Sequence, residues 1–227
     1  MDVKRRKPKS DEFVPALGLG VLTPLFDPLV RILMRERRFK SRLVEQMAIQ
    51  PGHRILDVGC GTGTLALLIK ERHPQSEVVG LDPDPQILAI ARSKTASARA
   101  DVRFDVGYAD RLPYPDAGFD RVISSLAFHH LTRETKRAAL REAYRVLRPG
   151  GELHIADVGR ASGMLMRLAV WPIVLLDGTD RVKDNVAGRL PAFMNEAGFT
   201  DVVEAEPFRT TFGPISLYRA SKLVTNL

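Results

Sequence analysis

Cysteine is almost absent from this chain of 227 residues. The single cysteine, Cys60, rules out an intramolecular disulfide and fits a reducing compartment. The start of the chain lacks the charged, apolar and small-residue succession of a secretory signal. The apolar stretch 13–34 is interrupted by three prolines and Asp27, which argues against a membrane span. We therefore expect a cytoplasmic protein.

Acidic residues are outnumbered, because 27 Asp and Glu face 34 Lys and Arg, for a formal charge of +7. The basic residues are dense in 4–9 and 31–42. Such charge can attract nucleic acid or anionic headgroups, but no nucleic-acid-binding module accompanies it. We expect 1–23 to be a basic N-terminal tail, disfavour a nucleic-acid partner and leave peripheral membrane contact open. The sequence indicates neither a metal site, since no cysteine or histidine cluster has ligand spacing, nor an oligomeric state.

The chain does contain a glycine-rich turn. Residues 54–64 indicate a short apolar strand with Asp57 near its end, followed by three alternating glycines and an apolar helical pattern. Glycine allows positive φ and lets a ligand approach the backbone, and the N–H groups that begin the next helix face whatever the turn holds. The turn is typical of a nucleotide or nucleoside site on a doubly wound sheet. Its G-x-G-x-G spacing differs from the G-x-G-x-x-G of dinucleotide folds.

A second carboxylate follows at the spacing that such a site requires. The next strand, 77–82, ends in Asp82 about 20 residues beyond the turn, where the ribose-binding acid of this fold belongs. Asp84 and Pro85 then predict the N-cap and first turn of a helix. We favour a ribose-binding role for Asp82 over that of a plain turn residue.

Alternating strands and helices predict an α/β domain with a parallel sheet. Thr132 predicts the start of a helix that ends at 149–151, and a shorter helix is expected near 188–197. We expect one domain over 24–227, with cap helices in 24–50 and an insertion or lid at 158–182. The predicted strands are 53–58, 77–82, 101–106, 119–125, 151–157, 202–206 and 215–221.

The ordered segments resemble those of class I S-adenosylmethionine-dependent methyltransferases. After the glycine turn and Asp82 come 107–114 (GYADRLPY), 119–131 and 145–151. The chain is most similar to the branch of ubiquinone/menaquinone-biosynthesis C-methyltransferases and small-molecule methyltransferases. The resemblance implies a Rossmann-like, seven-stranded, mostly parallel sheet with helices on both faces and an antiparallel last strand. It also implies S-adenosylmethionine as the cofactor.

The resemblance implies which residues contact that cofactor. The backbone of Gly59, Cys60 and Gly61 would lie against the methionine moiety, and Asp57 would orient the turn and the amino group. Asp82 would hold the ribose.

Further contacts come from later segments. In the family, the aspartate of a G-D-A segment often holds the adenine. Here Tyr108 stands at that position, before Ala109, so Asp110 or Tyr108 would take over the contact. Ser124 and Ser125 would flank the methionine part and the transfer site.

His129 and His130 are the candidate catalytic bases, because an imidazole suits proton abstraction near neutral pH. Asp157, at the end of the strand 151–157, could orient one of them as in a catalytic triad. In some small-molecule O-methyltransferases of this branch such a histidine works with an aspartate, which matches His129 and Asp157. The alternative is that both histidines belong to a helix-entry motif and bond only to backbone.

The insertion bears on the acceptor. An adaptable wall over an apolar acceptor could be formed by Met164, Met166 and Trp171. Core packing is the alternative for the apolar residues Leu165, Leu168 and Val174. No Asn/Asp-Pro-Pro-Tyr/Phe motif follows 119–125, which disfavours amino-methylation of nucleic acid. We predict methyl transfer to a small, apolar or amphipathic acceptor, with O- or C-methylation favoured. The alternatives are a non-catalytic cofactor-binding module associated with RNA or membrane, and a nicotinamide-dependent oxidoreductase.

Overall fold

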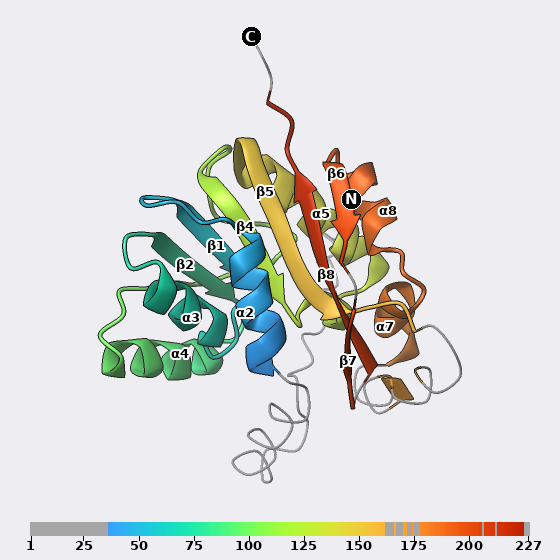
Figure 1. The fold of residues 1–227 in the computed structure, drawn as a ribbon, viewed down its shortest axis with the longest axis horizontal. Coiled ribbons are helices and arrows are strands. Elements are labelled where there is room, and N and C mark those ends of the chain that lie inside the picture. The colour runs from blue at the N-terminus through green and yellow to red at the C-terminus, as the bar shows by residue number, and fades with distance from the viewer. Residues whose placement is uncertain are drawn as a thin grey trace, which may run out of the picture.

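The computed structural model describes residues 36–161, 166, 170, 171, 174, 178–205, 207–211 and 213–224 (Figure 1). The predicted tail 1–23, the first part of 24–50 and about half of the insertion 158–182 lie outside the described residues. In the described part of the chain, no helix is long and apolar enough to cross a membrane.

A mixed sheet forms the centre of the molecule. Its strands are β1 (Arg54–Val58), β2 (Glu77–Asp82), β3 (Arg103–Val106), β4 (Phe119–Ser125), β5 (Leu147–Val158), β6 (Thr200–Glu204), β7 (Phe208–Thr210) and β8 (Gly213–Ser221). The order is β3-β2-β1-β4-β5-β8-β6, and the short β7 pairs with β8. Strands β1 to β5 are parallel and β8 is antiparallel to β5. The predicted Rossmann-like sheet is confirmed, and β7 is a strand that the sequence did not predict.

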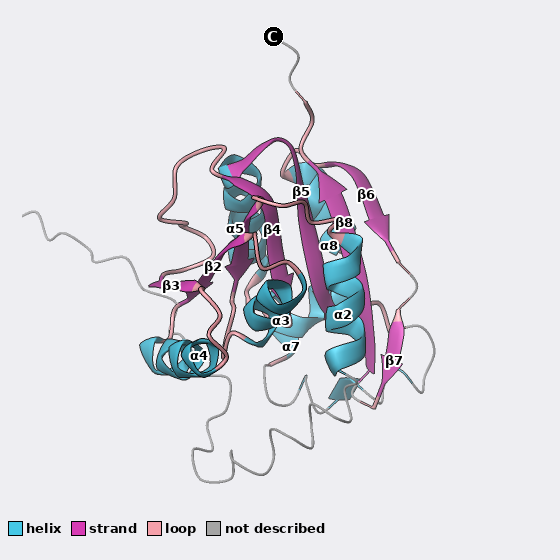
Figure 2. Cartoon of the chain, turned by 60° about the vertical axis from the view of Figure 1, so that its left-hand side comes forward, coloured by secondary structure: helices cyan, strands magenta, loops and turns pink. Residues whose placement is uncertain are grey.

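Helices cover both faces of this sheet (Figures 1 and 2). They are α2 (Glu36–Gln46), α3 (Thr64–Arg72), α4 (Pro85–Ser97), the 3-10 turn η1 (Phe128–His130), α5 (Arg133–Val146), α7 (Thr179–Val186) and α8 (Leu190–Glu196). The predicted caps are present: Asp84 accepts from the Gln86 and Ile87 amides to begin α4, and Thr132 accepts from the Thr135 amide to begin α5.

Two apolar cores result, one on each face. Helices α2, α3 and α4 pack with residues such as Leu43, Ile69 and Leu88 against one face. Helices α5 and α8 pack with residues such as Leu140 and Phe193 against the other. The strand side chains alternate between the two cores because successive residues of a strand point to opposite faces. Because the sheet is packed on both faces, the carboxyl ends of its strands are held in fixed positions.

Strand β5 begins earlier than the predicted 151–157. Leu147 is fully buried and pairs with Phe119 of β4, so the apolar end of the helical pattern already belongs to the strand. Gly150 has a φ of +76°, which only glycine adopts without strain, and lies within the strand. The Pro-Gly-Gly segment is thus a distortion inside β5 and not only a helix end.

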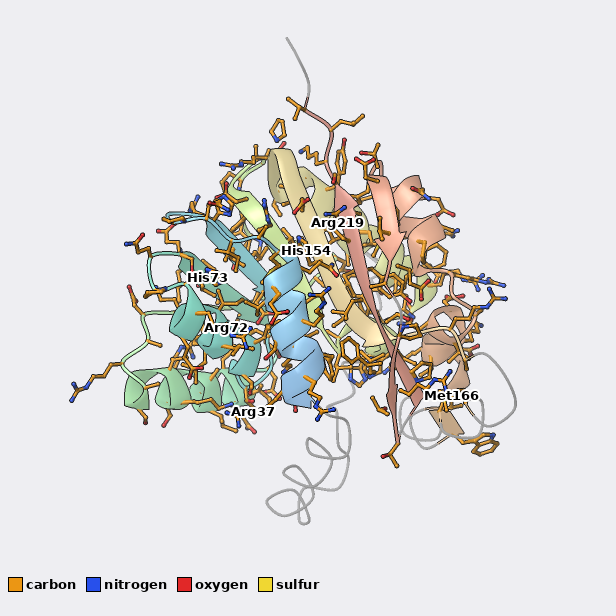
Figure 3. All side chains as sticks on the ribbon, viewed as in Figure 1. Arg37, Arg72, His73, His154, Met166 and Arg219 are labelled. Carbon is orange, nitrogen blue, oxygen red and sulfur yellow. The ribbon has the colours of Figure 1, made fainter. Side chains whose placement is uncertain are left out.

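The cap helix α2 is held to the sheet by a buried polar contact. Gln46 Nε2 lies 3.1 Å from His154 Nδ1, at the middle of β5 (Figure 3). The other ring nitrogen of His154 lies 3.2 Å from Glu152. Burial lowers the pKa of His154, so the ring stays neutral near pH 7. The opposite end of α2 thereby comes toward the carboxyl end of β1.

Candidate active site

The glycine turn after β1 is built for close approach. Gly59, Gly61 and Gly63 all have positive φ, between 52° and 71°. A Cβ at Gly59 would lie 2.5 Å from the Ala127 side chain, and one at Gly63 would lie 2.9 Å from the Phe104 ring. A Cβ at Gly61 would meet nothing within 4 Å. Packing therefore requires the outer two glycines, whereas Gly61 borders open space that a ligand can enter.

Asp82 stands beside this turn at the end of β2, as predicted. Its carboxylate accepts from the Gly61 amide at 2.9 Å and from the Asp84 amide at 3.1 Å. Partial burial raises the pKa of Asp82, against the lowering effect of these two bonds. Carboxylate oxygens have further lone pairs, so Asp82 can brace the turn and still accept from ribose hydroxyls.

Asp57 is buried without a partner. Its side chain is 1% exposed, and neither oxygen has a hydrogen bond within the described residues. Burial raises the pKa of Asp57 to about 7, with Lys40 acting to lower it and Asp82 to raise it. A buried carboxylate without donors is costly. Such a group is typical of a site that a cationic ligand completes.

Lys40 is a residue of this site that the sequence analysis missed. It lies on α2, is 9% exposed and pairs with Glu36 at 2.5 Å. Its charge acts on Asp57 across the gap between helix and strand. Phe39, Leu43 and Val44 on the same helix are also buried, so a lysine among apolar helix positions was the available signal.

The other predicted neighbours of the turn fall into two groups. Ser124 donates to the Val58 carbonyl at 2.8 Å and fixes β4 against β1, while the Ser125 hydroxyl is buried and has no partner among the described residues. Cys60 is buried, and burial raises the pKa of its thiol, which suits packing and not nucleophilic chemistry.

The predicted adenine segment lies beyond β3. Tyr108 is 55% exposed and forms an isolated bridge with Arg111. Ala109 is half-buried against the core, and Asp110 is exposed. Both polar groups are accessible, so the choice between Tyr108 and Asp110 for the adenine contact stays a prediction.

His129 and Asp157 are brought together as predicted. The His129 Nδ1 atom lies 2.7 Å from Asp157 Oδ1, and both side chains are buried. Asp157 also accepts from the amides of Phe128 and Val158, at 2.8 and 2.7 Å. Burial of Asp157 raises its pKa, but His129 and these bonds outweigh burial and hold the pKa below its usual value. Asp157 is therefore an ionised group that suits a proton on Nδ1 of His129.

The same turn, η1, touches the cofactor side. Ala127 precedes it and packs against Gly59, as the glycine geometry shows. The His130 ring lies 4.0 Å from the His129 ring, centroid to centroid, and its charge lowers the pKa of Asp82. The two histidines thus lie between Asp82 and Asp157, where an acceptor would meet the cofactor.

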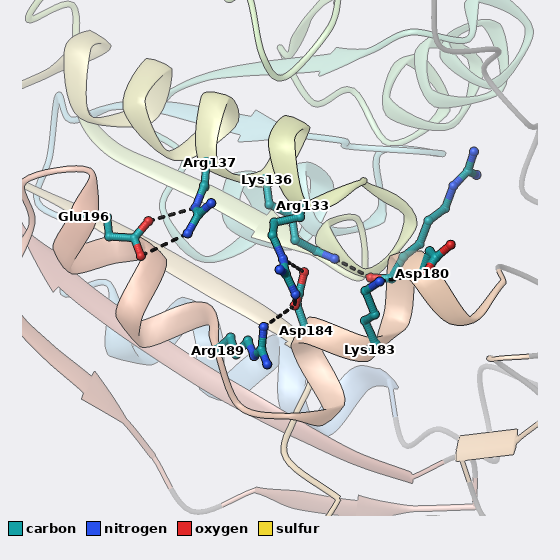
Figure 4. A network of polar contacts seen from close by, with 9 residues as sticks. Arg133, Lys136, Arg137, Asp180, Lys183, Asp184, Arg189 and Glu196 are labelled. Atoms are coloured by element: carbon teal, nitrogen blue, oxygen red, sulfur yellow. Dashed lines mark hydrogen bonds and ion pairs between the residues drawn. The ribbon is translucent and has the colours of Figure 1, made fainter.

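Helix α7 supports this turn through contacts that the sequence did not predict. Asn185 is fully buried and donates from Nδ2 to Asp157 at 3.1 Å. Its neighbour Asp184 binds Arg133 of α5 and Arg189 (Figure 4). Lys136 donates to a backbone carbonyl of α7, and burial lowers its pKa to about 8. The available signal was a polar residue three positions after buried Val182 in a helical pattern.

Comparison with known proteins identifies the family. A sequence model of the methyltransferase domain matches residues 55–151. A demethylmenaquinone methyltransferase of Deinococcus radiodurans is 40% identical over 219 residues, which cover 88% of this chain and 89% of that protein. This chain belongs to the S-adenosylmethionine-dependent methyltransferases. A demethylmenaquinone methyltransferase of Thermus thermophilus is 42% identical over 138 residues, or 60% of this chain and 62% of that protein.

Solved structures agree with the methyltransferase fold. The S-adenosylmethionine-dependent methyltransferase SibL has a TM-score of 0.68 at 25% identity, over 90% of this chain and 61% of SibL. A phosphoethanolamine N-methyltransferase of Haemonchus contortus in complex with S-adenosylmethionine has a TM-score of 0.67 at 17% identity, over 82% of this chain and 52% of that one. This methyltransferase is therefore an enzyme that uses S-adenosylmethionine.

The described residues of this methyltransferase fit that cofactor. The unpartnered carboxylate of Asp57 suits the ammonium group of the methionine part, and the open space at Gly61 suits a ligand lying on the backbone. The buried Ser125 hydroxyl offers one more unused polar group. No group of three or more potential metal ligands occurs among the residues that the structure describes.

Proposed function

We propose that this methyltransferase methylates a ring carbon of a reduced, demethylmenaquinone-type quinol. The relative from Deinococcus radiodurans, alike over almost the whole of both chains, supports this class of acceptor. The observation that carries the proposal is the buried His129–Asp157 pair beside the cofactor turn. An aromatic carbon becomes nucleophilic when a ring hydroxyl loses its proton, and a positioned imidazole is suited to remove that proton. After methyl transfer, the methylated ring carbon loses its own hydrogen as a proton, which restores the aromatic quinol.

The cofactor would be held by four groups of residues. Asp57 would pair with the ammonium of the methionine part and Lys40 with its carboxylate. The Lys40 charge acts on Asp57, which supports a place for both side chains in one site. The backbone at Gly59 and Gly61 would lie along that part, and Asp82 would accept from the ribose hydroxyls. When bound, S-adenosylmethionine supplies an electrophilic methyl group on a sulfonium. These contacts hold it in line with the acceptor, which is a main source of rate in such a displacement.

The protein's own contribution to the reaction is a proton transfer. His129 Nε2 would accept the proton of a quinol hydroxyl, and Asp157 would stabilise the resulting imidazolium through the 2.7 Å contact at Nδ1. Asp157 suits this role because its pKa is held low, so it does not take the proton itself. His130 is the alternative base, since it lies in the same turn.

An apolar wall beside the pair suits the acceptor. Val158, Val170 and Val182 are buried in one core cluster with Ile215. Met166 and Val174 are half-buried against it, while Trp171 is 61% exposed. Met164 of the predicted wall lies outside the described residues, as do Leu165 and Leu168, for which core packing was the alternative. An apolar wall on a segment with an exposed tryptophan supports an acceptor with an apolar body and a peripheral membrane contact during its delivery.

The test is methyl transfer from isotopically labelled cofactor to a short-chain demethylmenaquinol kept under reducing conditions. We expect a product heavier by one labelled methyl on a ring carbon, formed from the quinol and not from the oxidised quinone. The His129→Gln variant is the control, because it keeps the fold but loses the base. A labelled methyl found on a quinol oxygen would mean that the enzyme catalyses O-methylation and not C-methylation. Absence of any labelled product with wild-type enzyme that binds the cofactor would overturn the proposal.

A further inference from the structure

Two consecutive residues of α7 are buried polar groups with different partners. Asp184 and Asn185 are both fully buried. Asp184 faces away from the site and binds Arg133 and Arg189, at 2.5 and 3.5 Å (Figure 4). Asn185 faces the site and donates to Asp157 at 3.1 Å. The first contact holds α7 against α5, and this holds the amide of the second at a fixed place beside Asp157.

The Asn185 amide is only half used. Its Nδ2 donates to Asp157, but its Oδ1 is buried and has no partner within the described residues. A buried acceptor without a donor destabilises the folded protein. A leucine of similar size would fill the same space beside Val182 without that cost. Packing therefore does not explain the amide, and the bond to Asp157 does.

We propose that Asn185 is a positioning residue for the His129–Asp157 pair, which sets how strongly Asp157 attracts the Nδ1 proton of His129. This inference rests on the proposed role of His129 as base. Asp157 Oδ1 already faces His129 and the Val158 amide, so Asn185 is a third donor to the same oxygen. Each donor withdraws charge from that oxygen and weakens its hold on the imidazolium. Asn185 should thus make His129 less basic than it would be without this third donor.

Other titratable groups also act on the pair. Those that act electrostatically on Asp157 are His130 on η1, Lys136 on α5 and Tyr218 on β8. None of these residues is substituted in an Asn185 variant. A change in the pKa of His129 in such a variant is therefore assigned to the lost amide.

The experiment is an NMR titration of the His129 ring without acceptor, with its signal assigned from its absence in His129→Gln. In Asn185→Leu we expect the His129 pKa to rise by about half a unit to one unit, as follows from losing one hydrogen bond to its carboxylate partner. Asn185→Asp replaces the donor by a second carboxylate, and we expect a larger rise. In turnover, the acid limb of the pH profile should move up by the same amounts, so that kcat on this limb falls by about three- to tenfold in Asn185→Leu.

Gln46→Leu is the matched control. It also removes an amide that contacts a buried histidine, His154, but on the α2 side of the sheet. Folding of each variant is checked by its melting temperature. A His129 pKa that stays unchanged in folded Asn185→Leu, or that rises equally in Gln46→Leu, would overturn the inference. A rise of the His129 pKa that is confined to the Asn185 variants supports the inference. If demethylmenaquinol is not methylated in the same experiments, only the proposed acceptor is rejected.

Discussion

Asp57 and Asp157 are two buried carboxylates of one sheet with opposite environments. Each lies at the carboxyl end of a parallel strand, and they are 1% and 0% exposed. Asp57 has no hydrogen-bond partner among the described residues, and burial raises its pKa to about 7. Asp157 accepts from four groups, and its pKa is lowered despite its burial.

The difference separates the two halves of the site. On the Asp57 side, the Asp57 carboxylate and the Ser125 hydroxyl have no hydrogen-bond partner among the described residues, which suits a ligand that supplies the partners. On the other side, Asp157 receives its four donors from the protein, and these fix its position against His129. We therefore infer that cofactor binding completes the surroundings of Asp57, whereas the donors to Asp157 are present in the protein alone. Substitutions on each side of the site test this division.

Removing the base tests the acceptor side. With a hydroxyl or acidic-carbon acceptor, His129→Ala should lower turnover by about 10²–10⁴, the usual contribution of general base catalysis. Cofactor affinity should stay nearly unchanged, because the imidazole belongs to the other half of the site. Asp157→Asn should reproduce part of the loss. Single-turnover kinetics and a cofactor titration measure the two effects separately.

Two results would contradict that division. Equal rates for wild type and His129→Ala on a hydroxyl acceptor would leave positioning as the source of rate. Loss of cofactor binding in a folded His129→Ala variant would mean that the histidines are structural. The alternative interpretation of the histidines as a helix-entry motif would then hold.

Filling the open space tests the cofactor side. Gly61→Val should lower S-adenosylmethionine affinity by at least about 100-fold, because its side chain would enter the space that the ligand needs and because φ at this position is +52°. Gly52→Val is the matched control: Gly52 also has positive φ and open surroundings, but lies at the other end of β1. Calorimetry should show weak binding in the first variant only. Similar affinity in both would place the ligand elsewhere.

The cofactor half of the site was predictable because its residues lie close together in the sequence. The strand, the glycine turn and Asp82 follow each other closely in the sequence, so spacing alone placed them beside one another. The same holds for the sheet, whose strands and caps depend on short patterns. The early start of β5 was missed because it depends on the pairing of Leu147 with Phe119.

The acceptor half depends on contacts between distant residues. Asn185 meets Asp157 from 28 positions away, and no local pattern encodes that distance. The strand-end position of Asp157 predicted a contact with one of the two histidines, and the resemblance to a family favoured His129. Lys40 was missed because its action on Asp57 depends on how helix α2 packs on the sheet, which a basic helical pattern does not reveal.

Removing the Asp82 carboxylate, which we expect to bind the ribose, should lower cofactor affinity less than Gly61→Val does. Asp82→Ala should weaken cofactor binding by about 1.5–3 kcal/mol, roughly 10- to 150-fold, because charge-assisted hydrogen bonds are lost. Part of this loss comes from the Gly61 amide, which Asp82 holds at 2.9 Å. The control is Asp84→Ala, which removes the cap of α4 and should lower stability by about 1 kcal/mol with little effect on affinity. Unchanged affinity in folded Asp82→Ala would reject the ribose assignment.

The last effect is the pH dependence that distinguishes the two carboxylates. The pKa of Asp57 is raised from 3.8 to about 7, so between these values the folded protein holds a proton that the unfolded chain has released. Its stability without cofactor should therefore fall as pH rises from about 4 to about 7. Asp157 has a lowered pKa, so its contribution is present above about 4 and is lost only below that pH. Asp57→Asn should remove the first slope and leave the second.

Cofactor binding should depend on pH in the opposite sense to stability. The ammonium of S-adenosylmethionine favours ionised Asp57, so binding releases a proton and affinity should rise with pH by up to about tenfold per unit until about pH 7. Calorimetry in buffers of different ionisation enthalpy measures that proton. In Asp57→Asn the affinity should become independent of pH over this range, while Asp157→Asn should retain the dependence. A pH-dependent affinity that persists in Asp57→Asn would assign the proton to another group and end the contrast between the two carboxylates.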